Sequence, residues 1–167
     1  NARPPAAVVA GNTETSSRVA DLVTDALGEF KPVAANGQGT MNNLTLAGEG
    51  FTYYETIGGG QGACPDADGP SAVHVAMSNT LNTPIEALEL TYPLRVERYE
   101  LASDSGGAGT FRGGLGVRRQ WRILADETSV NLRMDRFKFS SLGVFGAKPA
   151  RASRAVLNPG SPTERAL

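Results

Sequence analysis

Apolar residues in the first thirty positions recur at the spacing of an α-helix. Asn12 or Thr13 is suited to cap the start of this helix, with Glu14 in its first turn. Gly28 is suited to end it, and Pro32 prevents an easy continuation. The pattern therefore predicts one helix of about 15 residues, whose apolar positions are Val19, Leu22, Val23, Ala26, Leu27 and Phe30.

Beyond the helix, the pattern changes to short runs of β-branched, aromatic and alternating residues between glycines. Val130, Leu132 and Met134 alternate with polar neighbours, which is typical of a half-buried strand. In the run 117–124 a charged residue, Arg119, interrupts an otherwise apolar face. The strands expected from these patterns cover residues 6–10, 51–56, 72–77, 94–101, 117–124, 129–134 and 155–157.

These elements predict an α+β fold, in which one early amphipathic helix precedes a β-rich region with many glycine loops. The length of 167 residues suits a single domain, or the carboxyl-terminal portion of a larger subunit. Residues 148–167 form a tail rich in proline, arginine and serine. The chain has neither an initiator methionine nor a secretory leader, which favours a processed or partial chain. A cytoplasmic location fits the single cysteine, which is compatible with either compartment.

The composition excludes several classes of function. A formal net charge of −1 gives no basic surface for nucleic acid or an anionic membrane. No apolar run is long enough to span a membrane. A single cysteine, Cys64, excludes an internal disulfide and a cysteine-rich zinc site. Nearby acids nearly balance a group of arginines, which is interpreted as a solvated sheet face: Arg118, Arg119, Arg122, Arg133 and Arg136.

Glycine is the unusual component, because fifteen of the 20 glycines lie between Gly37 and Gly116. In the run Gly58–Gly60, positive φ angles can turn backbone N–H groups toward an anion or a carbonyl oxygen, and no Cβ keeps a ligand away. The alternative is a tight turn, or a crossing of two backbones that needs glycine for packing. A phosphate loop and a dinucleotide fingerprint both fail, because neither Gly-Lys-Ser/Thr nor a periodic helix follows.

The only histidine, His74, lies in an apolar run and is expected on a strand with small neighbours. Its imidazole can act as a base near neutral pH, although a buried histidine with satisfied hydrogen bonds is an equal alternative. One histidine cannot form a metal site alone. Asn79 and Asn82 offer the paired donors and acceptors that an amide substrate needs, or they stabilise two successive turns.

Three further charged residues are candidates for chemistry. Glu86 and Glu89 lie three positions apart and can divide acid and base work, or they are solvated surface charges. Arg112 lies in the glycine-rich stretch Gly106–Gly116, where it can clamp a carboxylate or a phosphate. The alternative for this stretch is a long bulged hairpin, in which Arg112 pairs with Asp104.

Eight short motifs, in this order, resemble the hydantoinase B/oxoprolinase family. The resemblance covers nearly the whole chain, and the ordered set is far more specific than any single glycine run. The motifs are Gly11–Ser16, Gly39–Asn43, Tyr54–Gly60, Met77–Thr80, Asn82–Glu86, Glu89 with Tyr92-Pro93, Asp104–Gly109 and Arg112–Gly116.

Members of this family are longer, so the chain resembles the carboxyl-terminal part of the B-type subunit. The resemblance implies ATP-dependent opening of a cyclic amide, such as a hydantoin, 5-oxoproline or a lactam. ATP is then bound by a hydantoinase A-type partner, which phosphorylates the amide oxygen, and the B-type part directs water to the activated carbon. The resemblance places the divalent metal in the amino-terminal part of the B-type subunit, so none is expected on this chain alone.

A phosphorylated intermediate is planar and anionic, and a glycine-lined pocket with amide donors suits it. Two alternatives stay open: a ketone carboxylase of the acetone or acetophenone type, and a structural half of the B-type subunit without chemistry of its own. For this chemistry our hypothesis assigns catalytic roles to Glu55, His74 and Glu86, and substrate contacts to Gly58, Gly59, Gly60, Asn79, Asn82 and Arg112.

Overall fold

A computed structural model describes residues 3–6, 11–28 and 30–167 of the chain. A π-helical turn, η1 (Gly11–Thr15), continues directly into the α-helix α1 (Ser16–Gly28), so the predicted helix and its end are confirmed. The predicted start is wrong, because Asn12 and Thr13 lie within η1, which begins at Gly11. Of the strand predicted over 6–10, residues 7–10 lie outside the described residues.

The central strand of the larger sheet is β1 (Asn43–Gly48), which the sequence patterns did not predict. It pairs antiparallel with β2 (Phe51–Thr56) on one side and with β5 (Thr128–Arg133) on the other. Leu46 lies opposite Tyr53 on β2 and opposite Val130 on β5. The strands predicted over 51–56 and 129–134 are thereby confirmed, the second ending one residue early.

Two further strands, β3 (Leu94–Leu101) and β4 (Val117–Ile123), pair antiparallel as a two-stranded ribbon. The register shifts at an irregularity between Val96 and Arg98. Both predicted strands and the long hairpin around Gly106–Gly116 are confirmed by this ribbon.

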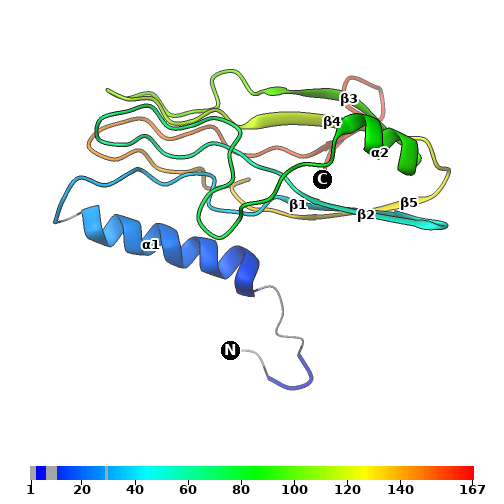
Figure 1. The fold of residues 1–167 in the computed structure, drawn as a ribbon, viewed down its shortest axis with the longest axis horizontal. Helices are drawn as coiled ribbons and strands as arrows, with labels where there is room; N and C mark the ends of the chain where they lie inside the picture. The colour runs from blue at the N-terminus through cyan, green and yellow to red at the C-terminus, as the bar shows by residue number, and fades with distance from the viewer. Residues whose placement is uncertain (1–2, 7–10, 29) are drawn as a thin grey trace.

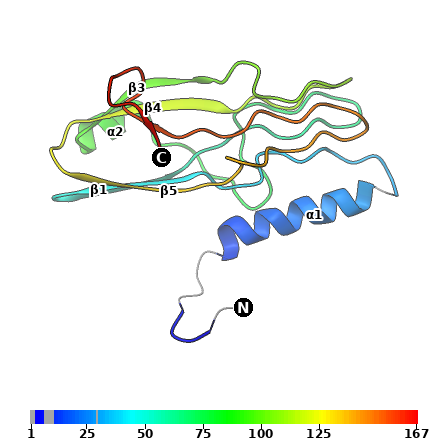
Figure 2. The same cartoon turned by 180° about the vertical axis from the view of Figure 1, so that it is seen from behind.

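A short helix, α2 (Ile85–Thr91), leads into β3, and the small strands β6 (Val156–Leu157) and β7 (Arg165–Ala166) pair near the end of the chain. In Figure 1, the β3–β4 ribbon with α2 forms one layer and the β2-β1-β5 sheet forms the other. Figure 2 shows the same layers from behind, with α1 outside them. The predicted α+β fold is therefore confirmed.

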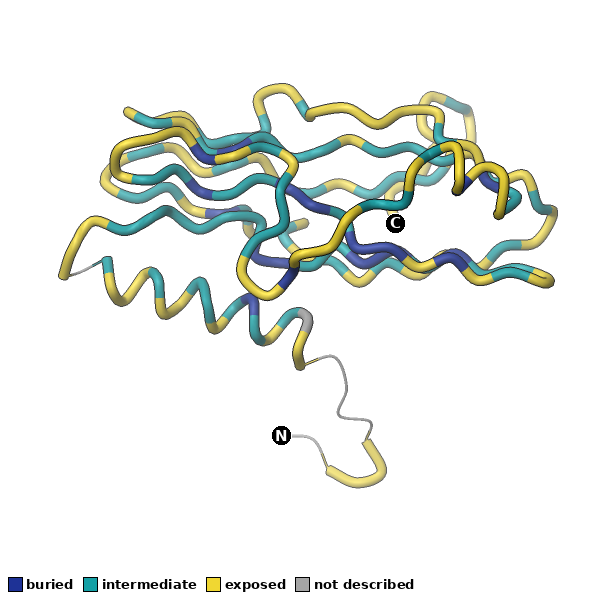
Figure 3. Tube along the Cα trace, in the orientation of Figure 1, coloured by how far each residue is buried: buried dark blue, intermediate teal, exposed yellow. Residues whose placement is uncertain are grey.

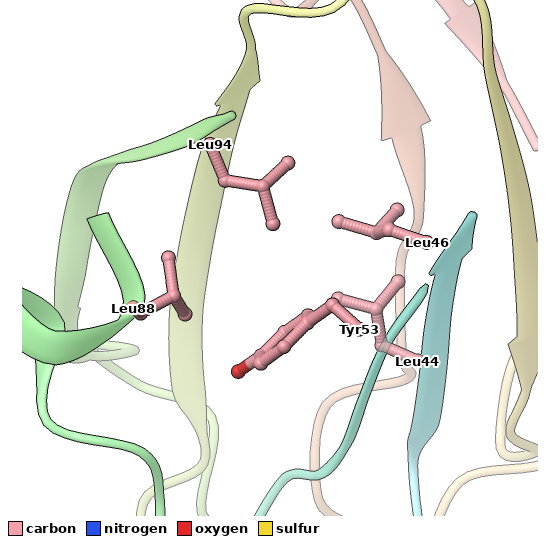
Figure 4. Close-up of a cluster of buried hydrophobic side chains, with 5 residues drawn as sticks. All are labelled: Leu44, Leu46, Tyr53, Leu88 and Leu94. Carbon is pink, nitrogen blue, oxygen red and sulfur yellow. The ribbon is translucent and has the colours of Figure 1, made fainter. Parts of the chain in front are cut away.

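The hydrophobic core lies between these two layers and is small. Tyr53 packs its ring against Tyr92, with the two ring centroids 5.2 Å apart. Figure 4 shows side chains of α2 and β3 facing those of β1 and β2 across the gap. The buried apolar residues of this core are Leu44, Leu46, Tyr53, Leu88 and Leu94.

The glycine-rich half of the molecule consists of extended segments that lie side by side at the left of Figure 1. Hydrogen bonds between these segments recur every third residue, since the N–H of Ala35 donates to Ala63 and that of Gln38 to Gly60. This period is that of a polyproline II helix, whereas a β-strand has a period of two. The same three-residue spacing separates two other pairs of hydrogen bonds. The N–H groups of Gly69 and Ala72 donate to the carbonyls of Arg112 and Leu115, and those of Lys148 and Arg151 donate to the carbonyls of Ala108 and Ser105.

Close approach between backbones explains the glycines of these segments. A Cβ at Gly62 would overlap the carbonyl oxygen of Ala35, and one at Gly60 would overlap that of Gly114. The positive φ predicted for Gly58–Gly60 is wrong. In the described ranges, the glycines with positive φ are Gly39, Gly50, Gly146 and Gly160. The observed arrangement is the alternative prediction, a crossing of backbones that needs glycine for packing.

The strand predicted over 72–77 is also wrong. Within this segment, Val73 forms an isolated bridge by exchanging hydrogen bonds of 2.7 and 3.1 Å with Gly59. Ala72 and Ala76 have φ angles of 55° and 52°, which lie in the left-handed region and interrupt an extended strand. The apolar run therefore belongs to the irregular glycine-rich half, and its composition alone did not reveal this.

Charged contacts hold α1 against the rest of the molecule. Arg136 Nη2 donates to Asp21 at 2.6 Å, and Arg18 Nη2 donates to Asp135 at 2.6 Å. Burial raises the pKa of the Asp21 carboxyl, against the opposing effect of the two arginines. The apolar face predicted for the helix is left largely open, as Figure 3 shows and as the 67% exposure of Leu22 confirms.

The chain exposes more surface than a compact protein of its mass. Its accessible surface is 10754 Å², whereas a compact monomer of 17.5 kDa exposes about 7,900 Å². Large apolar side chains contribute to the excess, among them Leu81, Leu90, Phe30 and Phe145.

Replacing Gly62 with alanine is expected to destabilise the intact protein, because the new Cβ forces two backbones apart. The expected cost is about 1–3 kcal/mol or more. Gly116→Ala is the matched control, since a Cβ there meets only Ser105 Oγ at 3.8 Å. Thermal unfolding scans of both variants measure the difference, and equal midpoints would contradict the packing explanation.

Replacing Leu88 with alanine is expected to cost about 2–5 kcal/mol, because it empties the position that anchors α2 in the core. Leu88 is 0% exposed, whereas Leu90 on the same helix is 89% exposed. Leu90→Ala should therefore change stability by less than about 0.5 kcal/mol. Chemical denaturation of the two variants checks this contrast, and a similar loss in both would show that α2 is not anchored through Leu88.

Candidate functional site

An ion pair between Glu55 on β2 and Arg119 on β4 connects the two layers. Arg119 Nη1 donates to one carboxylate oxygen of Glu55, and the backbone N–H of Thr83 donates to the other at 2.8 Å. Only 4% of the Glu55 side chain and 1% of the Arg119 side chain are exposed. Both oxygens of Glu55 are therefore engaged in a site removed from water.

Two aromatic rings and an amide extend this pair into a network. The Arg119 guanidinium lies 4.7 Å from the ring centroid of Tyr99 and 5.0 Å from that of Trp121. The Tyr99 hydroxyl donates to Asn82 Oδ1 at 2.8 Å, and Asn82 Nδ2 donates to the carbonyl of Thr56 at 3.1 Å. Asn82 thus ties the end of β2 to β3, with both ends of its amide in use.

His74 lies beside this network and carries the titratable group best suited to proton transfer. Its Nε2 is 3.3 Å from the Thr80 hydroxyl, and its buried Nδ1 has no hydrogen-bond partner within the described ranges. Burial lowers the pKa of the imidazole, although the nearby Glu55 carboxylate opposes this shift. The ring is therefore neutral near pH 7, and one of its nitrogens can accept a proton.

Tyr53 places a phenol on the other side of Glu55. Burial, followed by interaction with the Glu55 carboxylate, raises the pKa of this phenol well above its ordinary value. The hydroxyl is therefore protonated. Figure 4 shows its oxygen at the margin of the apolar core.

The glycine run follows β2 directly and packs against the segment that carries His74. The N–H of Gly59 is taken by the carbonyl of Val73, and the carbonyl of Gly60 accepts from Gln38 at 2.9 Å. A Cβ at Gly58 would meet the backbone of Val73 at 3.1 Å. The run therefore sets the distance between two backbones next to the imidazole, and the Gly59 amide is already bonded.

The other predicted site residues lie at the surface. Glu86 is exposed in the first turn of α2, and Asn79 is exposed in the loop that carries Thr80. Arg112 is exposed too, and its backbone N–H and guanidinium both contact Asp68, the ion pair measuring 3.6 Å. The predicted pairing of Arg112 with Asp104 is wrong, since Asp68 comes close through the neighbouring extended segment.

Sequence reasoning missed Arg119, which it assigned to a solvated sheet face. The signal that could have found it was present, because Arg119 interrupts the apolar stripe of β4 that Val117 and Trp121 share. A charge on an inward face requires a buried partner. That partner, Glu55, lies 64 residues away and could not be paired with it by spacing.

The described residues offer no group of three or more histidine, cysteine, aspartate and glutamate side chains able to hold a metal ion. No helix in the described ranges has the length and apolar character needed to cross a membrane.

Comparison with known proteins places these features in a family. The sequence profile described as hydantoinase B/oxoprolinase matches residues 1–166. The chain is 42% identical over 144 residues to a 5-oxoprolinase of Dictyostelium discoideum, an alignment that covers 86% of this chain and 11% of that protein. It is 34% identical over 134 residues to the B-type component of a D-/L-hydantoinase of a Pseudomonas species, covering 77% and 22% of the two.

A solved structure, the nucleotide-free form of an acetone carboxylase described as carrying out ATP-dependent acetone carboxylation, has a similar fold. The TM-score is 0.62 at 24% identity, covering 78% of this chain and 18% of that one. The chain spans between about a tenth and a quarter of the length of the relatives it matches first. The match over nearly all of its residues shows that the chain belongs to the hydantoinase B/oxoprolinase family.

Proposed function

We propose that the chain forms part of an ATP-dependent enzyme that opens a cyclic amide, such as a hydantoin, 5-oxoproline or a lactam. The observation that carries the proposal is the neutral imidazole of His74 beside the buried Glu55–Arg119 pair. The names 5-oxoprolinase and D-/L-hydantoinase among its relatives support the reaction class.

In this proposal the chain works as the carboxyl-terminal part of a larger B-type subunit, in the cytoplasm, with a hydantoinase A-type partner. The partner binds ATP and phosphorylates the amide oxygen, which makes the ring carbon susceptible to water. A divalent metal belongs to the remaining part of the B-type subunit. The exposed surface in excess of a compact protein supports a chain that has neighbours to pack against.

His74 is the proposed general base. A neutral imidazole can remove a proton from water, and the Thr80 hydroxyl near Nε2 orients the ring. Asn79, exposed in the loop next to Thr80, is the asparagine free to meet a substrate amide. For Glu86 and Arg112 the predicted roles stay predictions, since both side chains face solvent.

Glu55 takes a positioning role in this proposal in place of the acid–base role that the sequence suggested. One of its oxygens accepts from Arg119 and the other from the N–H of Thr83, and these two bonds fix the orientation of the carboxylate. Asn82 acts in the same way, because its amide joins Thr56 to Tyr99. Together they hold the loop that carries Thr80 against β2.

A ketone carboxylase is the second candidate, and the fold it shares with acetone carboxylase favours it. In that case the same partner arrangement phosphorylates an enol, and carbonate takes the place of water. A purely structural role is the third candidate, and the behaviour of His74 separates it from the other two.

Replacing His74 with glutamine should lower turnover of the intact, partnered enzyme about 100-fold or more, because the proton acceptor is lost. Wild-type activity should fall on the acid side with a midpoint below pH 6.5, since burial lowers the imidazole pKa and protonation removes the base. Steady-state rates across pH measure both effects, and gel filtration confirms assembly.

Arg122→Met is the control for this variant, because Arg122 lies on β4 with 65% of its side chain exposed. Its turnover should stay within about twofold of wild type, as expected for an exposed residue outside the site. Wild-type turnover in the His74→Gln enzyme would favour the structural role.

Single variants Glu55→Gln and Arg119→Met should each destabilise the protein by about 3–5 kcal/mol, because each leaves a buried charge or polar group without its partner. The double variant should cost much less than their sum. The exposed pair Glu97 and Arg122 supplies the control, for which the same changes should cost about 0–1 kcal/mol. A double-mutant cycle by denaturation measures both pairs, and additive losses at Glu55 and Arg119 would refute the coupling.

A further inference from the structure

Arg119 has hydrogen-bond donors that the network does not use. Its Nη1 contacts Glu55, whereas Nε and Nη2 have no hydrogen-bond partner in the described part of the chain. Trp121 Nε1 on the same strand is also buried without one. Three donor nitrogens are thus left unsatisfied on one face of β4.

Unsatisfied buried donors are costly, and those of a charged group more so. The rings of Tyr99 and Trp121 cover the faces of the guanidinium, which is where cation–π contacts act. They supply no acceptor in the plane of the group, where the N–H bonds point. The in-plane edge formed by Nε and Nη2 is therefore the part of Arg119 that lacks a hydrogen-bond acceptor.

Arg119 is one of the residues that line a large cavity in the described part of the chain. Arg119 and Trp121 line it from β4, and Leu44 and Leu46 line it from β1. Only 1% of the Arg119 side chain is exposed, and burial strengthens a charge-assisted hydrogen bond. The spacing of Nε and Nη2 matches the two oxygens of a planar oxyanion, which arginine binds as a fork.

We propose that Arg119 is an anion-binding residue, whose Nε and Nη2 receive the two oxygens of a planar oxyanion such as a ligand carboxylate. Glu55 holds the guanidinium in place from its other side, and Trp121 Nε1 supplies a third donor. Both guanidinium nitrogens are buried, so entry of the ligand requires the side chains that cover this edge to move. This inference rests on the proposed function, in which it assigns recognition of an acidic group on the substrate.

Other arginines of the described chain do not offer such an edge. Arg136 is bonded to Asp21 and to the carbonyl of Gln38. The guanidinium of Arg112 lies against Asp68 and the carbonyl of Gly113, in contact with solvent. Arg119 differs in being almost wholly buried with two free donors.

The test compares wild type and Arg119→Lys in the intact enzyme. Lysine keeps a positive charge for Glu55 but lacks the planar fork. Calorimetric titration without ATP measures binding of 5-oxoproline, which carries a carboxylate, and of 2-pyrrolidinone, the same ring without it. We expect the variant to bind 5-oxoproline at least tenfold more weakly and 2-pyrrolidinone with unchanged affinity.

Two further variants keep the result interpretable. The double variant Glu55→Gln/Arg119→Met removes both buried charges, so it retains a fold if Arg119→Lys does not, and it should lose 5-oxoproline affinity as well. Arg122→Met, on the same strand but exposed and paired with Glu97, should bind like wild type. Equal affinity for 5-oxoproline in wild type and both Arg119 variants would overturn the inference, as would wild type that binds neither 5-oxoproline nor bicarbonate.

A bicarbonate titration separates the two sources of a planar oxyanion. Binding of bicarbonate that depends on Arg119, without binding of 5-oxoproline, supports the site and assigns it to a carboxylase. Binding of 5-oxoproline that depends on Arg119, without ATP-dependent ring opening by the assembled enzyme, also supports the site while refuting the proposed hydrolase. The two proposals therefore fail in distinguishable ways.

Discussion

The ion pair between Glu55 and Arg119 joins two layers across a small hydrophobic core. Five buried hydrophobic residues of the described ranges form this core, and partly buried ones pack against them. Buried ion pairs contribute less to net stability than to the choice of one arrangement over others, because desolvation offsets much of their attraction. Here the pair determines how β4 lies across β2, and through Thr83 it also positions the loop that follows His74.

The strands that could be predicted are those whose own side chains alternate. β2, β3, β4 and β5 carry enough β-branched, aromatic or alternating residues to be recognised one at a time. β1 has only two large apolar residues, Leu44 and Leu46, and its place at the centre of the sheet comes from the strands on either side. The seven residues of α2 are too few to show a helical period.

The residues of the candidate site that are close in sequence could be predicted, whereas those that are distant in sequence could not. Glu55 and the glycine run follow one another on β2 and beyond, and His74 reaches them through the bridge between Val73 and Gly59. Arg119 comes from a strand far along the chain, and only its position on an apolar stripe distinguished it from the other arginines. Glu86 and Arg112 had suitable chemistry, but their exposure depends on the packing of α2 and the extended segments.

Hydrogen bonds between the glycine-rich segments recur every third residue, and this spacing by itself does not fix the register of one segment against the next. Because few side chains lie between these segments, sliding one past another by three residues would bring new N–H groups opposite new carbonyls. Hydroxyl side chains at defined positions oppose this: Ser71 Oγ accepts from the N–H of Leu115 at 2.9 Å, and Ser105 Oγ from that of Gly116 at 2.8 Å. Each bond exists in one register only, so a few serines align segments that glycine allows to approach.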